Sequence, residues 1–380
     1  MIHLAIPDLR GNEAKYLREC IETTFVSSVG PFVTRLEEMM SGAVGATYAV
    51  ATSSGTTGLH LALTAIGVQP DELVVLPSFT FIASANAISH CGASPWLVDV
   101  SKDSWTLDPQ LLDEVLAKET KRSQKGLIHI TTGKRVAAIM PVYALGMPAD
   151  MARIREITEQ YRLSVVADAA AAVGAEYNGA LIGDWADISV FSFNGNKTVT
   201  AGGGGMLAGN NKELLDLARH LSTTARRGPD YDHDMVGFNY RMTNIQAAVG
   251  CAQMERLKSF IAAKRRIDMT YRQRLKDIQG ISFFPSPAWA KSACWFTGIT
   301  LEGPGLPSVP DLCGRLKEMG IEARIFWKPV HLQKSYASCP KTEMVVSGQI
   351  WDKILTLPCS THLSETEQET VITSIERVLK

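Results

Sequence analysis

Short apolar runs that alternate with helical patterns, between residues 47 and 209, constrain the fold of this chain more than any other feature. The runs are rich in Val, Ile or Phe and most show little polar alternation, as expected for strands buried on both faces. Amphipathic stretches such as residues 59–66 and 148–161 lie between them. This alternation predicts an α/β fold with a mostly parallel sheet and helices on both sides. The runs occupy residues 47–53, 72–78, 94–100, 135–142, 163–169, 187–193 and 205–209.

The pattern changes after residue 210. Residues 211–221 read as a helix, and residues 224–244 are polar, aromatic and rich in turn formers, which indicates a long functional loop. Helical periodicity extends over residues 244–278, which is longer than one ordinary helix. We therefore expect a kinked helical segment that bridges two domains. A chain of 380 residues exceeds the ~250–300 at which one core stops growing. We therefore predict a large domain of residues 1–250 and a smaller α+β domain of residues 251–380.

Charge and cysteine usage exclude several classes of protein. The net charge of −1 argues against a nucleic-acid binder, since such affinity comes mostly from neutralising phosphates. No apolar run reaches the ~18 residues of a membrane helix, and the opening residues lack a signal-peptide pattern. The seven scattered cysteines form no CxxC pair, so neither a disulfide framework nor a metal site is expected. A cytoplasmic location fits best.

Lys197 lies just past an apolar run and shortly before four consecutive glycines at residues 202–205. A loop lysine facing solvent is the alternative. Ser192 and Asn196 add hydrogen-bonding groups, however, and glycines let the backbone pass close to a bulky ligand. A partly desolvated lysine has a lowered pKa, which makes its amine a nucleophile toward carbonyls. Neither a Walker nor a Rossmann phosphate loop fits, because Asn196 precedes the lysine and a strand follows the glycines.

Asp168 ends the apolar run at residues 163–169 and is followed by small residues. A strand-end aspartate in a parallel sheet faces the crevice where ligands bind. The alternative is a helix N-cap. Together with Lys197 the functional interpretation prevails, because enzymes that use pyridoxal 5'-phosphate (PLP) pair a Schiff-base lysine with an acidic partner for the pyridine nitrogen.

A turn rich in Ser, Gly and Thr follows the first apolar run and opens a helix. Exposed N–H groups and the positive end of the helix dipole make a phosphate site there. An ordinary capped helix is the alternative, but it does not account for so many hydroxyl groups. Ser192 can add another hydroxyl. The candidates in the turn are Ser54, Gly55, Thr56 and Thr57.

Two further segments carry candidate ligand contacts. Phe79 and Phe81 follow a strand end, where an aromatic ring can stack on a flat cofactor, although core packing is as good an interpretation for Phe79. The long loop offers Asn239, Tyr240 and Arg241, and a bidentate arginine suits phosphate or carboxylate. A surface turn is the alternative for that loop.

Seven segments in a fixed order carry a family resemblance that covers nearly the whole chain. They read FVSSVGPFVTRLEE (25–38), SSGTTGLHLAL (53–63), PSFTFIASANAI (77–88), DAA…GAEYNG (168–179), FSFNGNK (191–197), GFNYRMTNIQAAVGCAQME (237–255) and IEARIFWKPVH (321–331). This set resembles the DegT/DnrJ/StrS-type nucleotide-sugar aminotransferases. FVSSVGPF, TTGKR (131–135) and FSFNGNK are most similar to the branch that acts on UDP-4-keto-6-deoxy-N-acetylhexosamine, in bacillosamine-type and legionaminic-acid-type pathways.

The resemblance implies a fold-type I PLP enzyme with a mixed, mostly parallel seven-stranded sheet, working as a homodimer with active sites at the subunit interface. Lys197 matches the Schiff-base lysine and Asp168 the partner of the pyridine nitrogen. For the cofactor it further implies phosphate contacts from Ser192, Gly55 and Thr56, a ring contact from Phe81, and a contact from Asn239 of the other subunit. The substrate-binding candidates are Phe25, Ser28, Tyr143, Arg241, Arg324 and His331.

The implied reaction moves an amino group from L-glutamate to a nucleotide-linked 4-keto-6-deoxy sugar, with Lys197 as general base and acid. Two positions depart from the family pattern: Ala171 replaces a Gln, Glu or His, and Tyr143 replaces a His. Both bear on substrate and proton handling. The same chemistry on a GDP- or dTDP-linked sugar or a keto-inositol remains open, as does a non-catalytic PLP-binding sensor. PLP-dependent sugar dehydratases carry histidine in place of the lysine, so Lys197 argues against them.

Overall fold

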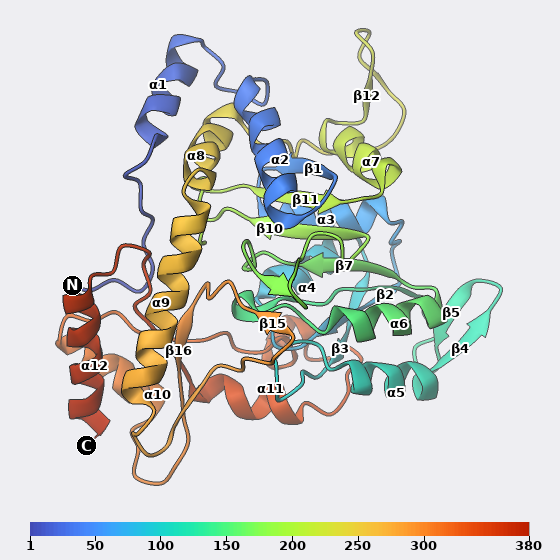
Figure 1. Ribbon diagram of the computed structural model, residues 1–380. Helices are drawn as coiled ribbons and strands as arrows, with labels where there is room; N and C mark the ends of the chain where they lie inside the picture. The colour runs from blue at the N-terminus through green and yellow to red at the C-terminus, as the bar shows by residue number, and fades with distance from the viewer. Residues whose placement is uncertain (380) are drawn as a thin grey trace.

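A computed structural model describes residues 1–379 and places all seven apolar runs in one sheet (Figure 1). The strand order is β1-β11-β10-β7-β6-β2-β3. Neighbouring strands are parallel except at β11, which is antiparallel to both β1 and β10. The expected mixed, mostly parallel seven-stranded sheet is confirmed. Its strands are β1 (Tyr48–Thr52), β2 (Leu73–Pro77), β3 (Ser94–Val98), β6 (Val136–Ile139), β7 (Ser164–Asp168), β10 (Ile188–Ser192) and β11 (Gly205–Gly209).

Helices cover both faces of this sheet because alternate residues of each strand point to opposite sides. On β2, Leu73 and Val75 pack into one apolar core, whereas Val74 and Leu76 pack into another. The first core is closed by α2 (Pro31–Val44), α5 (Pro109–Glu119), α6 (Met151–Tyr161) and α8 (Asn244–Met254). The second is closed by α3 (Gly55–Ala65), α4 (Ile82–His90) and α7 (Lys212–Ser222).

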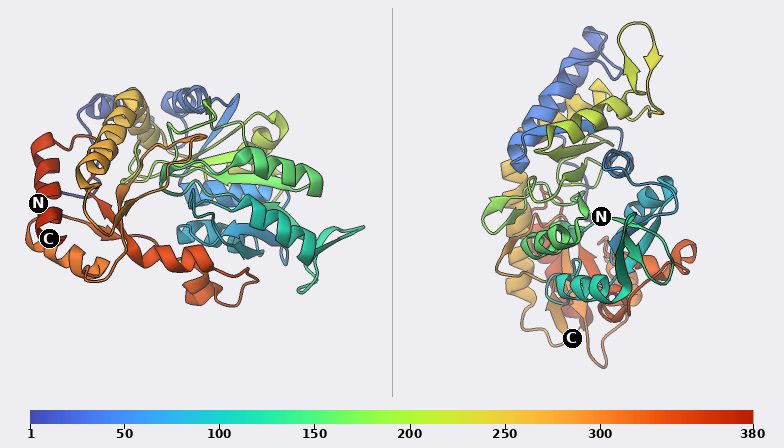
Figure 2. Two further views of the ribbon diagram at one scale, coloured as in Figure 1. Left: turned by 60° about the horizontal axis from the view of Figure 1, so that its bottom comes forward. Right: turned by 90° about the vertical axis from the view of Figure 1, so that its right-hand side faces the viewer.

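A four-stranded antiparallel sheet in the C-terminal third builds a third apolar core beside the main sheet (Figures 1 and 2). Leu4 packs into this core and Ile2 pairs with Ile321, so the N-terminal residues lie against the C-terminal ones. The division of the chain at residue 250 stays a prediction. The elements here are β14 (Ile281–Phe283), β16 (Thr297–Leu301), β17 (Arg324–Ile325), β18 (Ile354–Leu357), α9 (Leu257–Leu275), α10 (Val309–Glu318), α11 (Val345–Ile350) and α12 (Glu365–Leu379).

The long helical segment breaks between α8 and α9 at Glu255 and Arg256, as the sustained period predicted. Helix α9 then runs along the C-terminal sheet (Figure 1). The polar loop before α8 contains a projecting hairpin that the sequence reading missed, β12 (Arg226–Arg227) with β13 (Asp232–His233). Among residues 1–379, no helix combines the length and apolar character needed to span a bilayer.

The remaining elements are short or lie at the edges of the fold. They are α1 (Glu13–Glu22), β4 (Thr120–Ser123), β5 (Gly126–His129), β8 (Glu176–Tyr177), β9 (Ala180–Leu181), β15 (Ala290–Lys291) and four 3₁₀ turns, Ala144–Gly146, Val330–Leu332, Lys334–Tyr336 and Trp351–Lys353.

Candidate active site

A cavity of about 560 Å³ lies where β7 and β10 end and α3 begins. Its size falls within the usual range of ligand sites, and its position at strand carboxyl ends is where α/β proteins bind ligands. The main sheet supplies Asp168 and Ser192, whereas the C-terminal elements supply Trp295, Arg324 and Trp327. The cavity therefore lies between the two parts of the fold.

Lys197 and Asp168 both line this cavity, as predicted. The turn after β10 carries Lys197, and the main-chain N–H of Lys197 donates to Asn194 O at 2.9 Å. Burial lowers the pKa of Lys197 to about 8, and the negative charge of Asp168 partly offsets this effect. At neutral pH the amine therefore loses its proton far more readily than an ordinary lysine.

Asp168 is the last residue of β7 and is 6% exposed. Its carboxylate accepts hydrogen bonds from Ser84 Oγ at 2.6 Å and from the Ala170 N–H at 3.1 Å. Burial raises the pKa of Asp168, while both hydrogen bonds and the charge of Lys197 oppose the rise. A buried carboxylate held in this way is suited to pairing with a cationic ring nitrogen, since buried charges need a partner.

The start of α3 opens onto the cavity, and its binding of a phosphate stays a prediction. Ser54 is the N-cap, and Gly55 and Thr56 follow at the first two helical positions, whose N–H groups lack helical partners. These three residues and Ser192 line the cavity. Thr57 instead closes the capping box, because its N–H donates to Ser54 Oγ at 3.1 Å. Its proposed phosphate contact stays a prediction.

The glycine run allows β11 to pass directly beneath the start of α3. A β-carbon on Gly205 would lie 2.6 Å from Ser54 O and 2.7 Å from Gly55 N, which is closer than any side chain tolerates. Gly203 and Gly204 line the cavity itself. The glycines therefore permit a close approach between two backbone segments, whereas a close approach of backbone to ligand stays a prediction.

Aromatic rings form another wall of the cavity. Phe81 lines the cavity and lies 5.7 Å from Trp327 between ring centroids, whereas Phe79 is fully buried in the C-terminal core. Trp295 lies against Lys197, with 3.6 Å from Nζ to the ring centroid. Sequence reasoning missed Ser84, Trp295 and Trp327 as site residues. Ser84 and Trp327 lie inside segments quoted for the resemblance, but Trp295 carries no motif signal at all.

Some of the substrate candidates line the cavity and others lie outside its lining. Arg324 and Tyr143 line the cavity, as does Ala171. Tyr143 is 1% exposed, burial raises its pKa, and its hydroxyl has no hydrogen-bond partner among residues 1–379. His331 lies outside the lining and pairs with Ser78, at 2.6 Å between Nδ1 and Oγ.

Four further candidates lie outside the lining of this chain's own cavity. Arg241 forms a backbone bridge with Thr52 at the end of β1, shortly before the start of α3, and Phe25 is 45% exposed. Their proposed contacts to substrate or cofactor stay predictions. The four residues are Phe25, Ser28, Asn239 and Arg241.

The residues of the cavity fit PLP. Ser54, Gly55, Thr56 and Ser192 would hold its phosphate, Asp168 its ring nitrogen and Lys197 its aldehyde carbon. The fold brings an amine of lowered pKa, a buried carboxylate and a helix N-terminus to one cavity, which is the arrangement of a PLP-dependent enzyme.

Comparison with known proteins identifies the group within this class. A model described as the DegT/DnrJ/EryC1/StrS aminotransferase family matches residues 7–376. The chain belongs to this family, and the protein is a PLP-dependent aminotransferase.

Three similar proteins match over almost their whole lengths. A GDP-perosamine synthase from Caulobacter vibrioides is 38% identical over 384 aligned residues, covering 100% of this chain and 98% of that relative. An aminotransferase structure from Brucella abortus has a TM-score of 0.88 at 28% identity and covers 97% of this chain and 95% of that one. The aminotransferase TlmJ from Streptoalloteichus hindustanus has a TM-score of 0.89 at 27% identity, covering 100% and 99%.

Proposed function

We propose that this protein transfers an amino group from L-glutamate to a nucleotide-linked 4-keto-6-deoxy sugar, which gives a 4-amino sugar for surface polysaccharide or glycan synthesis. The observation that carries the proposal is the single cavity shared by Lys197, Asp168 and the start of α3. An aminotransferase needs all three together, and the volume of about 560 Å³ leaves room for a substrate beside the cofactor.

Each residue has a separate task in this reaction. PLP, when bound, takes up the electrons released as the substrate loses its proton. Asp168 keeps the ring nitrogen protonated, and Ser84 holds the Asp168 carboxylate in place. Lys197 removes and returns the proton, because its amine exchanges protons near neutral pH. The N-terminus of α3 binds the phosphate and anchors the ring.

The nucleotide carried by the sugar is the open part of the proposal. The resemblance of FVSSVGPF and FSFNGNK favours a UDP-linked acceptor, and this expectation stays a prediction. The relative named GDP-perosamine synthase supports a GDP-linked acceptor instead. Arg324, which lines the cavity, suits the pyrophosphate of either nucleotide.

A homodimer forms the second part of the proposal. Residues 25–29 expose apolar side chains, with Phe25 at 45% and Val29 at 59% exposure. Asn239 and Arg241 do not line their own chain's cavity. Both observations support a homodimer. The partner subunit would cover residues 25–29 of this chain, and Asn239 and Arg241 of this chain would enter the cavity of the partner subunit. The cytoplasmic location likewise stays a prediction.

The test begins with the purified protein and PLP. We expect near-visible absorbance on PLP binding, and bleaching of this absorbance by L-glutamate. The protein is then incubated with glutamate and a panel of GDP-, UDP- and dTDP-linked 4-keto-6-deoxy sugars, and amino-sugar products are identified by mass spectrometry. Lys197→Ala is expected to abolish turnover, and unimpaired transamination by this variant would contradict the assignment. Binding of PLP without bleaching would instead support a sensor.

A further inference from the structure

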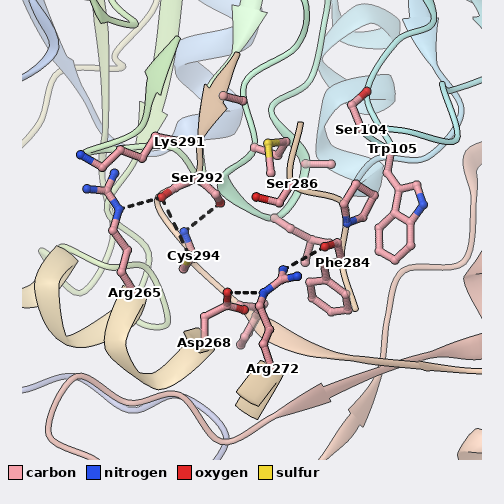
Figure 3. Close-up of a pocket in the computed structure, with 16 residues that line it drawn as sticks. Ser104, Trp105, Arg265, Asp268, Arg272, Phe284, Ser286, Lys291, Ser292 and Cys294 are labelled. Carbon is pink, nitrogen blue, oxygen red and sulfur yellow. Dashed lines mark hydrogen bonds and ion pairs between the residues drawn. The ribbon is translucent and has the colours of Figure 1, made fainter. Parts of the chain in front are cut away.

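The segment of residues 292–296 separates two cavities. Cys294 lines a smaller cavity of about 190 Å³, shown in Figure 3, whereas the next residue, Trp295, lines the main one. Cys294 adopts a left-handed backbone with a φ of 50°, which few residues other than glycine take. The chain turns sharply there, immediately before the indole that lies against Lys197.

Two side chains of α9 hold this segment in place. Arg265 Nε donates to Ser292 O at 3.0 Å, and Ser292 Oγ accepts from the Cys294 N–H at 3.0 Å (Figure 3). Lys264, which is 3% exposed, donates from Nζ to Trp295 O at 2.9 Å. Burying an ammonium is unfavourable unless it is well bonded, so the position of the Trp295 carbonyl is tightly specified.

The indole of Trp295 contacts the Lys197 region twice. Its Nε1–H donates to Asn196 O at 2.8 Å, the carbonyl directly before Lys197. The Nζ of Lys197 lies 3.6 Å from the ring centroid, within the range of a cation–π contact. Trp295 therefore contacts both the main chain next to Lys197 and the end of the Lys197 side chain.

We propose that Trp295 is a positioning residue for Lys197, which holds the ε-amine at one place in the cavity and stabilises its protonated form. This inference rests on the proposed transamination, in which the free amine of Lys197 would take up and return a proton on every turnover. A lysine amine sits on a flexible four-carbon stem, so one fixed position in the cavity reduces the conformations that the amine must search. Trp295 also packs against Phe296 and Trp327. The alternative is therefore that Trp295 only stabilises the cavity wall by packing.

The pKa of Lys197 in the cofactor-free protein separates these two views. It is measured by competitive acetylation across a range of pH, followed by mass spectrometry of the peptide that contains Lys197. Trp295→Leu keeps the wall apolar but removes the ring, so we expect the pKa to fall by about half a unit or more. Trp295→Phe retains an aromatic face and is expected to stay near wild type. Trp351→Leu, the same change outside the cavity, is the matched control.

An unchanged or raised pKa in a folded Trp295→Leu variant overturns the proposal. Should that variant fail to fold, incorporation of 5,6,7-trifluorotryptophan at all seven tryptophans supplies the test. This analogue nearly keeps the shape of the ring but weakens its attraction for cations, so the pKa of Lys197 is again expected to fall. No change in the fluorinated protein likewise overturns the proposal.

The glutamate half-reaction gives a second readout. In Trp295→Leu we expect the rate constant of bleaching to fall about tenfold while the half-saturating glutamate concentration stays within about twofold, since the lost contact is to the lysine and not to substrate. Trp295→Phe is expected to recover most of the rate. Equal losses in both aromatic and aliphatic variants indicate packing alone and overturn the proposal. Failure of the wild-type protein to bind PLP would refute the proposed function, whereas the acetylation result stands independently.

Discussion

At the scale of single residues, burial shifts the pKa values of the two charged groups in the cavity in opposite directions. It lowers the pKa of Lys197 to about 8 and raises that of Asp168. The neutral amine is the form that reacts with the aldehyde of PLP. We therefore expect PLP uptake by the cofactor-free protein to speed up by about tenfold per unit of pH below the pKa and to level off above it. Stopped-flow absorbance measures this, and a rate that still rises near the pKa of an ordinary lysine would contradict it.

Ser84 offers a second test at this scale. Its hydroxyl donates to Asp168 Oδ2 at 2.6 Å inside a buried site. Hydrogen bonds to charged groups contribute about 1.5–3 kcal/mol, so Ser84→Ala is expected to weaken PLP binding by about tenfold or more. Equilibrium titration of absorbance measures the loss. Ser89→Ala, on the same helix but bonded to Tyr336, is the control; equal affinity in both variants would exclude the proposed support of Asp168.

Sequence reasoning found those site residues that lie at strand ends or helix starts. Asp168 ends an apolar run, and Ser54 and Lys197 follow two others. All three lie where a parallel sheet opens onto its ligand crevice. Trp295 was not found, because its place beside Lys197 depends on how the C-terminal elements pack on the main sheet. Such long-range packing leaves no local pattern in the sequence.

At the scale of elements, the contact between β11 and the start of α3 shapes the cavity wall where we propose that the cofactor phosphate binds. A side chain at Gly205 would collide with Ser54 O, so Gly205→Ala forces the two elements apart. We expect a loss of about 1–3 kcal/mol in unfolding free energy and a marked loss of PLP affinity. Thermal unfolding and absorbance titration measure the two effects.

Gly42→Ala serves as the control for this change. Gly42 lies within α2 and its added β-carbon meets nothing within 4 Å, so equal or slightly higher stability is expected. A Gly205→Ala variant that binds PLP as tightly as the Gly42→Ala variant would show that the close approach is not needed.

The elements themselves were largely predictable, because apolar runs and helical periods are local properties. All seven strands and the break between α8 and α9 follow from the sequence. The β12–β13 hairpin was read as loop, because its strands are very short and every strand residue is exposed, from Arg226 to His233. No apolar pattern marks such an element.

At the scale of the whole molecule, a substitution among the exposed apolar side chains of residues 25–29 tests whether the protein is a dimer. Phe25→Asp is expected to convert a dimer into a monomer and to weaken PLP binding, because a charge cannot be buried unpaired at an interface. Sedimentation velocity measures the assembly. Ile130→Asp, at a 53% exposed position beyond the β4–β5 hairpin, is the control. A wild-type protein that sediments as a monomer would refute the dimer.

The pairing of β1 with β11 has a consequence for how the protein is made. Strand β1 is complete at Thr52, but the neighbour to which it is hydrogen-bonded ends at Gly209. At about 5–20 residues per second, a ribosome leaves the nascent β1 without that neighbour for roughly ten to thirty seconds. An unpaired apolar strand invites association with other chains during this interval. Strand β11, which packs against the start of α3, is therefore not available to the chain before the second half of translation.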